Sequence, residues 1–164
     1  MTLTQTELQG LFEYDPLSGV LTWKEKRSNM TKGSVAGCLH KSGYMVVTIN
    51  SKTYKLHRII WIYMFNVIPD EFYIDHINGN KVDNRLQNLR LATNHQNQQN
   101  RPAPKNSSSG YRGVNWHKQM NKWMARICHN KQRKIIGYFD TPEDAYAAYK
   151  LEAQKLFTHL DRLP

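Results

Sequence analysis

A carboxylate, an imidazole and many amide side chains are concentrated in one segment of the sequence, residues 72–100. The segment reads FYIDHINGNKVDNRLQNLRLATNHQNQQN, so Asp75 and His76 are adjacent and the amides follow them. Carboxylate and amide oxygens are hard ligands of the kind that suit Mg²⁺ or Mn²⁺. A histidine that is not needed as a ligand can act as a general base toward water. The segment therefore predicts a site for metal-assisted chemistry on a phosphate.

Two predicted strands flank the amide-rich loop. FYID, residues 72–75, and LRLA, residues 89–92, are short runs with β-forming residues between polar stretches. The loop between them carries Asn84 and Asn88. Asparagine competes for nearby backbone groups, so it favours loops over helices and strands.

A helix is predicted directly after the second strand. Thr93 is a good N-cap residue, and Gln96, three positions later, completes a capping box. The order strand, loop, strand, helix brings the end of the first strand near the start of this helix. Asp75, His76 and an amide of this helix, from Asn94, Asn97 or Asn100, can then converge on one point.

The region before this segment contains further predicted elements. GVLTWK, residues 19–24, is a short strand, and a hairpin joins Tyr44–Ile49 to Thr53–Leu56 through the polar turn 50–52. LHRIIWIYMFN, residues 56–66, is apolar all round. This pattern favours a short buried helix, with a strand as the alternative.

A linker separates this part of the chain from a second module. RPAPKNSSSG, at residues 101–110, has proline, serine and glycine without apolar periodicity. It predicts a first domain over 1–100, a linker over 101–109 and a second domain over 110–160. The second domain should contain the strands YRGVNWHK, KWMARICH and KIIGYF, followed by a helix. The expected class is α+β throughout.

The predicted helix of the second module lies at TPEDAYAAYKLEAQKLF. Thr141 caps it, Pro142 suits its first position, and the acids Glu143 and Asp144 complement the positive end of the helix dipole. One face at helical spacing is a predicted core stripe of Ala145, Ala148, Tyr149, Ala153 and Leu156.

The charge of the chain predicts a polyanionic partner. The formal net charge is +10, and residues 26–69 and 105–139 each contain several Lys and Arg but no acid. Solvated surfaces normally mix both signs, so these segments favour a phosphate-binding surface. No run approaches the roughly 18 apolar residues of a membrane-spanning helix. The first residues lack a secretory signal pattern, and Cys38 and Cys128 should be free, partly buried thiols of a cytoplasmic protein.

The segment IDHINGNKVDNRLQNLRLATNHQNQQN closely resembles the HNH endonuclease motif with its ββα-metal fold, especially that of phage homing endonucleases. The resemblance implies that Asp75 and Asn97 ligate one divalent metal, Mg²⁺ or Mn²⁺, and that His76 is the general base. Asn84 and Asn88 are candidates for the family's middle asparagine, which braces the loop and so aims the histidine. YDPLSGVLTW, GYMVVTI and LHRIIWIYMF also look like such phage proteins. His57, beside an apolar helix, is expected to be structural.

Residues 110–158 resemble the DNA-binding domain of plant ethylene-response factors, the APETALA type, through YRGV, KW-ARI and GYFDT-EDA-AAY. In that family a three-stranded sheet lies in the major groove and the helix packs behind it. In KWMARICH, Arg126 would face DNA while Ala125 and Ile127 face the helix. Ile135 stands where the plant pattern has tryptophan, which puts the target sequence in doubt. The resemblance implies DNA contacts from Arg112, Asn115, His117, Lys118, Arg126 and Arg133.

Together these features predict a metal-dependent HNH DNA endonuclease, a site-specific phage homing enzyme acting on double-stranded DNA in the cytoplasm of a bacterial host. It would be a monomer or a homodimer, because one metal site cuts one strand and cutting both needs a dimer or a second event. The resemblance implies products with a 3′-hydroxyl and a 5′-phosphate. The alternatives are a DNA-binding transcription regulator with a vestigial nuclease fold, and a nuclease for RNA or for defence.

Overall fold

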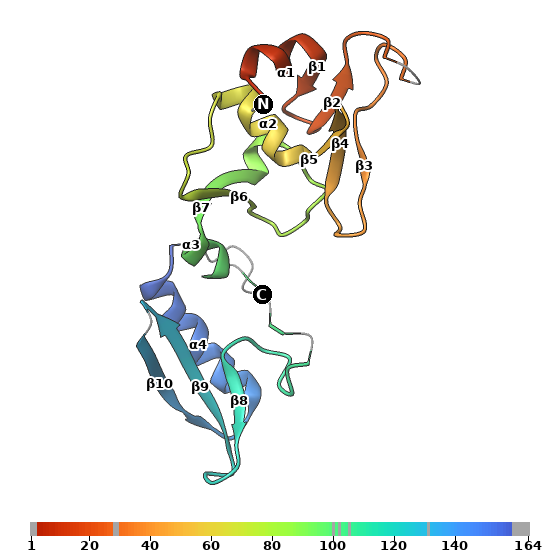
Figure 1. Cartoon of the computed structure of the whole chain (residues 1–164). Helices are drawn as coiled ribbons and strands as arrows, with labels where there is room; N and C mark the ends of the chain where they lie inside the picture. The colour runs from red at the N-terminus through yellow and green to blue at the C-terminus, as the bar shows by residue number, and fades with distance from the viewer. Residues whose placement is uncertain are drawn as a thin grey trace. The chain divides into compact units, whose positions relative to one another are not determined.

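The computed structural model describes residues 3–27, 30–99, 101, 103–104, 106–130 and 132–158. The chain divides into two compact units, Met1–Asn94 and His95–Pro164, whose elements are labelled in Figure 1. The division falls inside helix α3, Asn94–Gln99, and so lies before the predicted linker. Both units combine small antiparallel sheets with helices, which confirms the predicted α+β class.

The first unit has three small antiparallel sheets, β1-β2, β3-β4-β5 and β6-β7. Helix α2 follows the second sheet and confirms the helical interpretation of residues 56–66. A short 3₁₀ helix, η1, precedes β7. In chain order the elements are α1 Gln5–Leu11, β1 Phe12–Asp15, β2 Val20–Trp23, β3 Cys38–Leu39, β4 Met45–Ile49, β5 Lys52–Lys55, α2 Leu56–Phe65, β6 Phe72–His76, η1 Leu86–Asn88 and β7 Leu89–Thr93.

Helix α1 was not predicted, although the sequence carries its start signal. The Thr4 hydroxyl accepts a hydrogen bond from the Glu7 amide at 3.3 Å, and the Glu7 carboxylate accepts one from the Thr4 amide at 2.8 Å. This reciprocal pair is a capping box, and its Thr-x-x-Glu pattern is readable in the sequence.

The hairpin of β4 and β5 fixes where helix α2 begins. Asn50 and Ser51 form its turn with φ values of 48° and 63°, and two positive φ values are the pattern of a type I′ turn. Lys52 therefore belongs to the strand, not to the turn as predicted. Because β5 ends at Lys55, α2 starts at Leu56 and carries His57 in its first turn.

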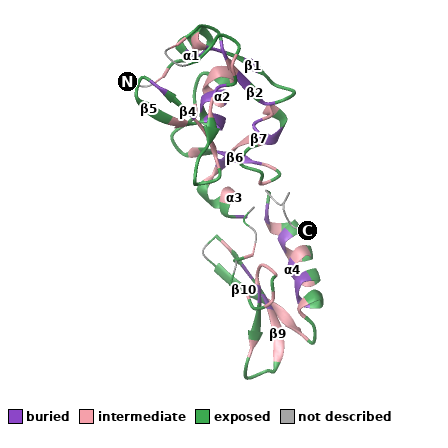
Figure 2. Cartoon of the chain, turned by 90° about the vertical axis from the view of Figure 1, so that its right-hand side faces the viewer, coloured by how far each residue is buried: buried purple, intermediate pink, exposed green. Residues whose placement is uncertain are grey.

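Helix α2 and the sheets enclose the core of the first unit. Ile59 and Ile60 of α2 are almost fully buried, in one cluster with Phe12, Leu21 and Ile49. Figure 2 shows buried segments on α2 and the strands around it. This core supports the β6-β7 ribbon through Ile74 and Leu89, which belong to the same cluster.

The second unit is a three-stranded antiparallel sheet of order β10-β9-β8 with α4 packed on one face. Its strands are β8 Val114–His117, β9 Lys122–His129 and β10 Gln132–Phe139, and its long helix is α4 Pro142–Leu156. The predicted cap of α4 is confirmed, since the Thr141 hydroxyl accepts a hydrogen bond from the Asp144 amide at 3.2 Å.

The predicted core stripe of α4 is largely confirmed. Ala145, Tyr149 and Ala153 are buried against Ala125 and Ile127 of β9. The remaining predicted members of the stripe, Ala148 and Leu156, are only half-buried. Tyr146 is buried as well and was not predicted.

The cysteines and the absence of a membrane helix bear on two further expectations. Cys38 and Cys128 are free, but both are exposed, so the prediction of partly buried thiols is wrong. Within the described part of the chain, no helix has the length and apolar character needed to cross a bilayer.

Gly113 is the tightest glycine position of the second unit and provides a test of its packing. Its φ is +75°, and an added Cβ would lie 2.4 Å from the Tyr149 ring and 2.7 Å from the Arg126 carbonyl oxygen. We expect Gly113→Ala to destabilise this unit by about 2–4 kcal/mol, through left-handed strain plus overpacking. Urea unfolding of the full chain measures this.

Gly110→Ala is the matched control, because Gly110 has a φ of +72° but no atom within 4 Å of the added Cβ. It should show only the strain, about 1–2 kcal/mol. Equal losses for the two variants would show that the contact with Tyr149 does not limit this position.

Candidate active site

Strand β6 ends in a buried acid–imidazole pair. Asp75 and His76 are 5% and 3% exposed, and they pair with Arg90 and Leu89 of β7. Directly paired residues of two strands share a face, so Arg90 meets Asp75. The Arg90 guanidinium donates to Asp75 Oδ2 from Nη2 at 3.1 Å and from Nε at 3.3 Å. A buried carboxylate needs such a partner to remain charged.

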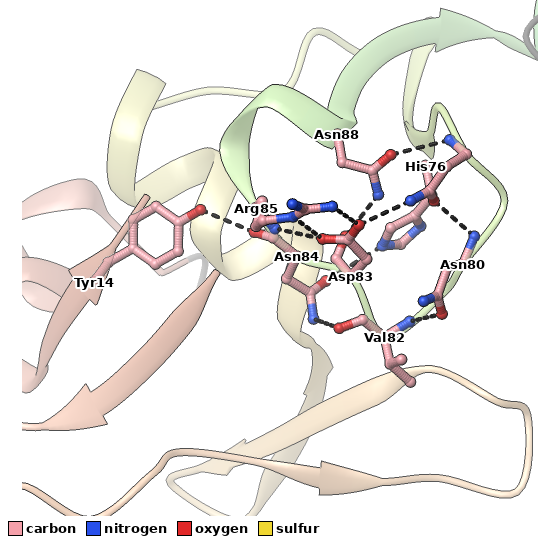
Figure 3. A network of polar contacts seen from close by, with 9 residues as sticks. Tyr14, His76, Asn80, Val82, Asp83, Asn84, Arg85 and Asn88 are labelled. Atoms are coloured by element: carbon pink, nitrogen blue, oxygen red, sulfur yellow. Dashed lines mark hydrogen bonds and ion pairs between the residues drawn. The ribbon is translucent and has the colours of Figure 1, made fainter. Parts of the chain in front are cut away.

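Asn84 determines which nitrogen of His76 can act as a base. His76 Nε2 lies 3.3 Å from Asn84 Oδ1, and Asn84 Nδ2 donates to the Val82 carbonyl at 3.2 Å. These contacts are drawn in Figure 3. A carbonyl can only accept, so the Asn84 amide turns its NH₂ to Val82 and its oxygen to His76. In neutral His76 the proton then sits on Nε2 and the basic lone pair on Nδ1.

Asn88 braces the loop between the two strands. Its Nδ2 donates to the Asp83 carbonyl at 2.8 Å, and its Oδ1 accepts from the Asn78 amide at 3.0 Å. Asn78 and Asn80 each cap a following amide two residues on, at 2.8 Å and 3.2 Å. The asparagines of this loop thus replace the regular hydrogen bonds that a strand or helix would provide.

Asp83 is the charged centre of the same loop. Its carboxylate accepts from Arg85 Nε at 2.8 Å, from Arg85 Nη2 at 2.6 Å and from Asn78 Nδ2 at 2.8 Å. The hydrogen bonds from Arg85 are the main reason that the pKa of Asp83 is lowered to about 2. Tyr14 of β1 donates to the Asn84 carbonyl at 2.9 Å, which ties the loop to the core.

His57 lies against His76, which the sequence did not reveal. The two ring centroids are 4.9 Å apart and the rings are nearly perpendicular. His57 is buried, and among the described residues its Nδ1 has no hydrogen-bond partner. Burial, reinforced by the charges on His76, Lys55 and Arg58, lowers the pKa of His57 to about 3. His57 therefore remains neutral near neutral pH and forms one wall around His76.

Asn97 lies on α3, half-buried, in the unit that begins at His95. It is the one predicted site residue of the nuclease motif outside the first unit, and its role as a metal ligand stays a prediction. Among the described residues, no group of three or more His, Cys, Asp or Glu side chains could hold a metal ion. A metal here would accordingly need amide oxygen beside the Asp75 carboxylate.

Of the predicted DNA-contacting residues, Asn115, His117, Arg126 and Arg133 occupy strand positions on the sheet face opposite α4, whereas Arg112 precedes β8 and lies near Phe157. Arg126 is exposed between the buried Ala125 and Ile127, as the alternation predicts. A cavity of about 670 Å³ is lined by Arg112, Asn115, Arg126 and Arg133 among others. His117 is half-buried and Lys118 is exposed.

Arg112 is engaged within the second unit itself. Its guanidinium donates to the main-chain carbonyls of Gln99 and Arg101, the latter at 2.9 Å. It also lies 5.9 Å from the centroid of the Phe157 ring. A DNA contact by this side chain would compete with these interactions, whereas Arg126 forms no ion pair within the described part of the chain.

Residues 54–99 match the family model for HNH endonucleases. The matched segment contains His57, Asp75, His76 and Asn97, together with both loop asparagines at 84 and 88. The segment that holds the candidate site is therefore similar to HNH endonucleases. The match ends at residue 99 and does not bear on the resemblance of residues 110–158 to the plant domain.

Two viral proteins are similar to this chain. Protein 3.8 of Escherichia phage T7 is 37% identical over 76 residues, which are 46% of this chain and 63% of that protein. An uncharacterized HNH endonuclease of Acanthamoeba polyphaga mimivirus, L560, is 38% identical over 120 residues, 73% of this chain and 61% of that protein. The chain thus covers less than two thirds of either relative.

A solved structure of the HNH homing endonuclease I-HmuI, described as showing DNA binding and cleavage, aligns with 89% of this chain and 81% of its own. The aligned residues are 21% identical and the TM-score is 0.43. This likeness is too distant to support a conclusion about the chemistry of the present chain.

Asp83 makes the stability of the loop dependent on pH. Its folded pKa of about 2 lies below the roughly 3.9 expected in the unfolded chain. A carboxyl group whose pKa is lower in the folded state stabilises the fold at pH values above its unfolded pKa. This stabilisation is lost as the pH falls through the folded pKa. Asp83→Asn should therefore have a lower free energy of unfolding than the wild type above about pH 4. The difference between the two free energies, the stability gap, should narrow toward pH 2.

Urea unfolding between pH 6 and pH 2.5 measures the gap, with Asp70→Asn as the control because Asp70 is exposed and outside the loop network. A gap that stays constant over this range would show that the charge of Asp83 does not stabilise the loop.

Proposed function

We propose that this chain is a metal-dependent DNA endonuclease of the phage homing type that hydrolyses a phosphodiester of double-stranded DNA. The observation that carries the proposal is the geometry around His76, a buried imidazole whose Nε2 lies 3.3 Å from the amide oxygen of Asn84. Because the Asn84 NH₂ is directed to Val82, this contact assigns the proton of the neutral ring to Nε2 and the basic lone pair to Nδ1. A general base needs this arrangement, with one nitrogen oriented by the protein and the other basic.

In this proposal His76 Nδ1 takes the proton from the attacking water, and Asn84 keeps the ring aligned while the imidazolium forms. Neutral His57 places no second positive charge beside that ring. Attack on phosphorus would leave a 3′-hydroxyl and a 5′-phosphate, as the resemblance implies.

Asp75 and Asn97 are the proposed ligands of one Mg²⁺ or Mn²⁺ ion. Their carboxylate and amide oxygens fit the preference of these ions for hard ligands. The Asp75 carboxylate forms an ion pair with Arg90, so a bound metal ion and the guanidinium would both interact with the same carboxylate. When bound, such an ion supplies stabilisation of the negative charge that develops on the phosphate and the leaving oxygen.

The second unit is proposed to bind DNA through its sheet, as in the plant APETALA-type domain that residues 110–158 resemble. The net charge of +10 and the exposed Arg126 support this assignment. In this proposal residues 1–100 are the nuclease part, residues 101–109 the linker and residues 110–160 the DNA-binding part. Asn97 then belongs functionally with Asp75, although α3 is part of the second compact unit.

One proposed metal site per chain implies that a monomer nicks one strand, and that a double-strand cut needs a homodimer or two events. The similarity to a phage T7 protein supports the proposed role in a phage-infected bacterial host, and action in the cytoplasm of that host is part of the proposal. A DNA-binding regulator with a vestigial nuclease fold remains the alternative function. It would bind DNA tightly without cutting it in any divalent metal.

Nicking of supercoiled plasmid in Mg²⁺ or Mn²⁺ tests the catalytic assignment. His76→Ala should lower turnover by about 10²–10⁴-fold and leave DNA affinity nearly unchanged, because the base acts mainly in the transition state. Asp75→Ala should abolish metal-dependent cleavage.

His40→Ala and Asp70→Ala are the controls for the lost imidazole and the lost carboxylate, since both residues are exposed and outside the site. Near-wild-type cleavage by His76→Ala or Asp75→Ala would refute the assignment of that residue.

The DNA-binding assignment predicts a salt-dependent contribution from the sheet. If Arg126 contacts a phosphate, Arg126→Ala should reduce the slope of log affinity against log salt by about 0.9, and a base contact should cost about 1–3 kcal/mol. Lys155→Ala removes an equal charge from the exposed side of helix α4 and should leave the slope unchanged. Identical titrations for wild type, Arg126→Ala and Lys155→Ala would remove the sheet from the proposed interface.

A further inference from the structure

The Tyr44 ring connects the candidate base to two exposed cations. It lies just before β4, half-buried, with its centroid 6.1 Å from that of His76 and 5.2 Å from that of His57. The ammonium of Lys55 is 4.4 Å from the same centroid and that of Lys81 is 4.5 Å away. These distances are within the range of cation–π attraction.

The two lysines reach Tyr44 from different parts of the first unit. Lys55 ends β5 immediately before α2, whereas Lys81 comes from the loop that follows β6. Lys81 Nζ also donates to the Ser42 carbonyl at 3.1 Å, so two contacts fix its position. Long exposed lysines ordinarily retain much side-chain freedom, and here it is reduced before any ligand arrives.

In the part of the chain that the structure describes, neither lysine is paired with an acid. Within the described part of the chain, the ion pairs of the first unit are Arg85 with Asp83 and Arg90 with Asp75, and neither lysine takes part. The segment around Lys55, residues 26–69, contains no acidic residue, and Asp83, two residues after Lys81, is paired with Arg85. The positive charge of Lys55 also contributes to the lowered pKa of His57. Two like charges held on one ring repel each other, and an anion bound between them would remove this repulsion.

We propose that Lys55 and Lys81, held on Tyr44, bind a DNA phosphate next to the scissile one and so place the cleaved strand beside His76. The inference rests on the proposed nuclease function and specifies its substrate contact. The lysines are one side chain removed from His76, because Tyr44 contacts all three. Each strand of DNA carries one phosphate per nucleotide, about every 3.4 Å along the helix axis. A phosphate next to the scissile one is therefore the anion expected at the lysines, one side chain away from His76.

Two measurements on the full chain test the lysine pair. The first is the affinity for a fluorescein-labelled duplex at several salt concentrations in Ca²⁺. The second is the single-turnover rate of nicking supercoiled plasmid at saturating protein in Mg²⁺. Lys55→Ala and Lys81→Ala should each lower the salt slope by about 0.9. Each should also slow nicking at saturation roughly tenfold or more, because the strand is misplaced relative to the base.

Lys52→Ala is the matched control on the same strand. Lys52 is exposed and three residues from Lys55, so the two side chains point to opposite faces of β5. Its nicking rate at saturation should equal that of the wild type. Tyr44→Leu should slow nicking like the lysine variants, whereas Tyr44→Phe, which retains the ring, should lose much less.

Unchanged slopes for both Lys55→Ala and Lys81→Ala would overturn the phosphate contact. Reduced slopes with wild-type nicking at saturation would overturn its placement beside His76. If the wild-type chain binds the duplex but nicks plasmid in neither Mg²⁺ nor Mn²⁺, the nuclease function fails instead, and the slopes alone then decide whether the pair contacts phosphate.

Discussion

The hydrogen bond between Asn84 and His76 is the constraint on which the candidate site depends. A neutral imidazole can present either nitrogen as its base, and here one amide makes the choice. That amide has its own orientation only because its NH₂ is committed to the Val82 carbonyl. The carbonyl is held in turn by the asparagine-braced loop between β6 and β7. The chemistry of one histidine is thus determined by the main-chain shape of a loop.

The two neighbouring side chains at the end of β6, Asp75 and His76, lie beside different kinds of partner, one charged and one neutral. Asp75 is buried and receives a cation, Arg90, because a buried carboxylate without a partner is costly. The imidazole of His76 receives a neutral neighbour, because burial lowers the pKa of His57 to about 3. A second imidazolium at 4.9 Å would oppose proton uptake by His76. Two further positive charges, those of Lys55 and Lys81, lie over the ring of Tyr44.

Local signals in the sequence are sufficient to predict most helices and strands. Contacts between residues far apart in the sequence could not be predicted from such signals. Strand β9 and helix α4 were predicted nearly to the residue because alternation, Thr141 and Pro142 are local features. The capping box of α1 is an equally local signal, because it depends only on Thr4 and Glu7. The place of His57 could not be predicted, since it depends on how the start of α2 packs against the end of β6. The roles of Asp75 and Asn97 came from the resemblance and remain proposals.

A backbone irregularity determines which side chains the second unit presents on its open sheet face. The register between β10 and β9 shifts between Ile135 and Gly137. Strict alternation would turn Ile136 inward and Phe139 outward, yet both pack into the core with α4. The extra residue of a bulge accounts for this, and it turns Tyr138 to the open face, 5.1 Å from His117. Because Ile135 stays paired with Arg126 on that face, the departure from the plant pattern lies within the proposed contact surface itself.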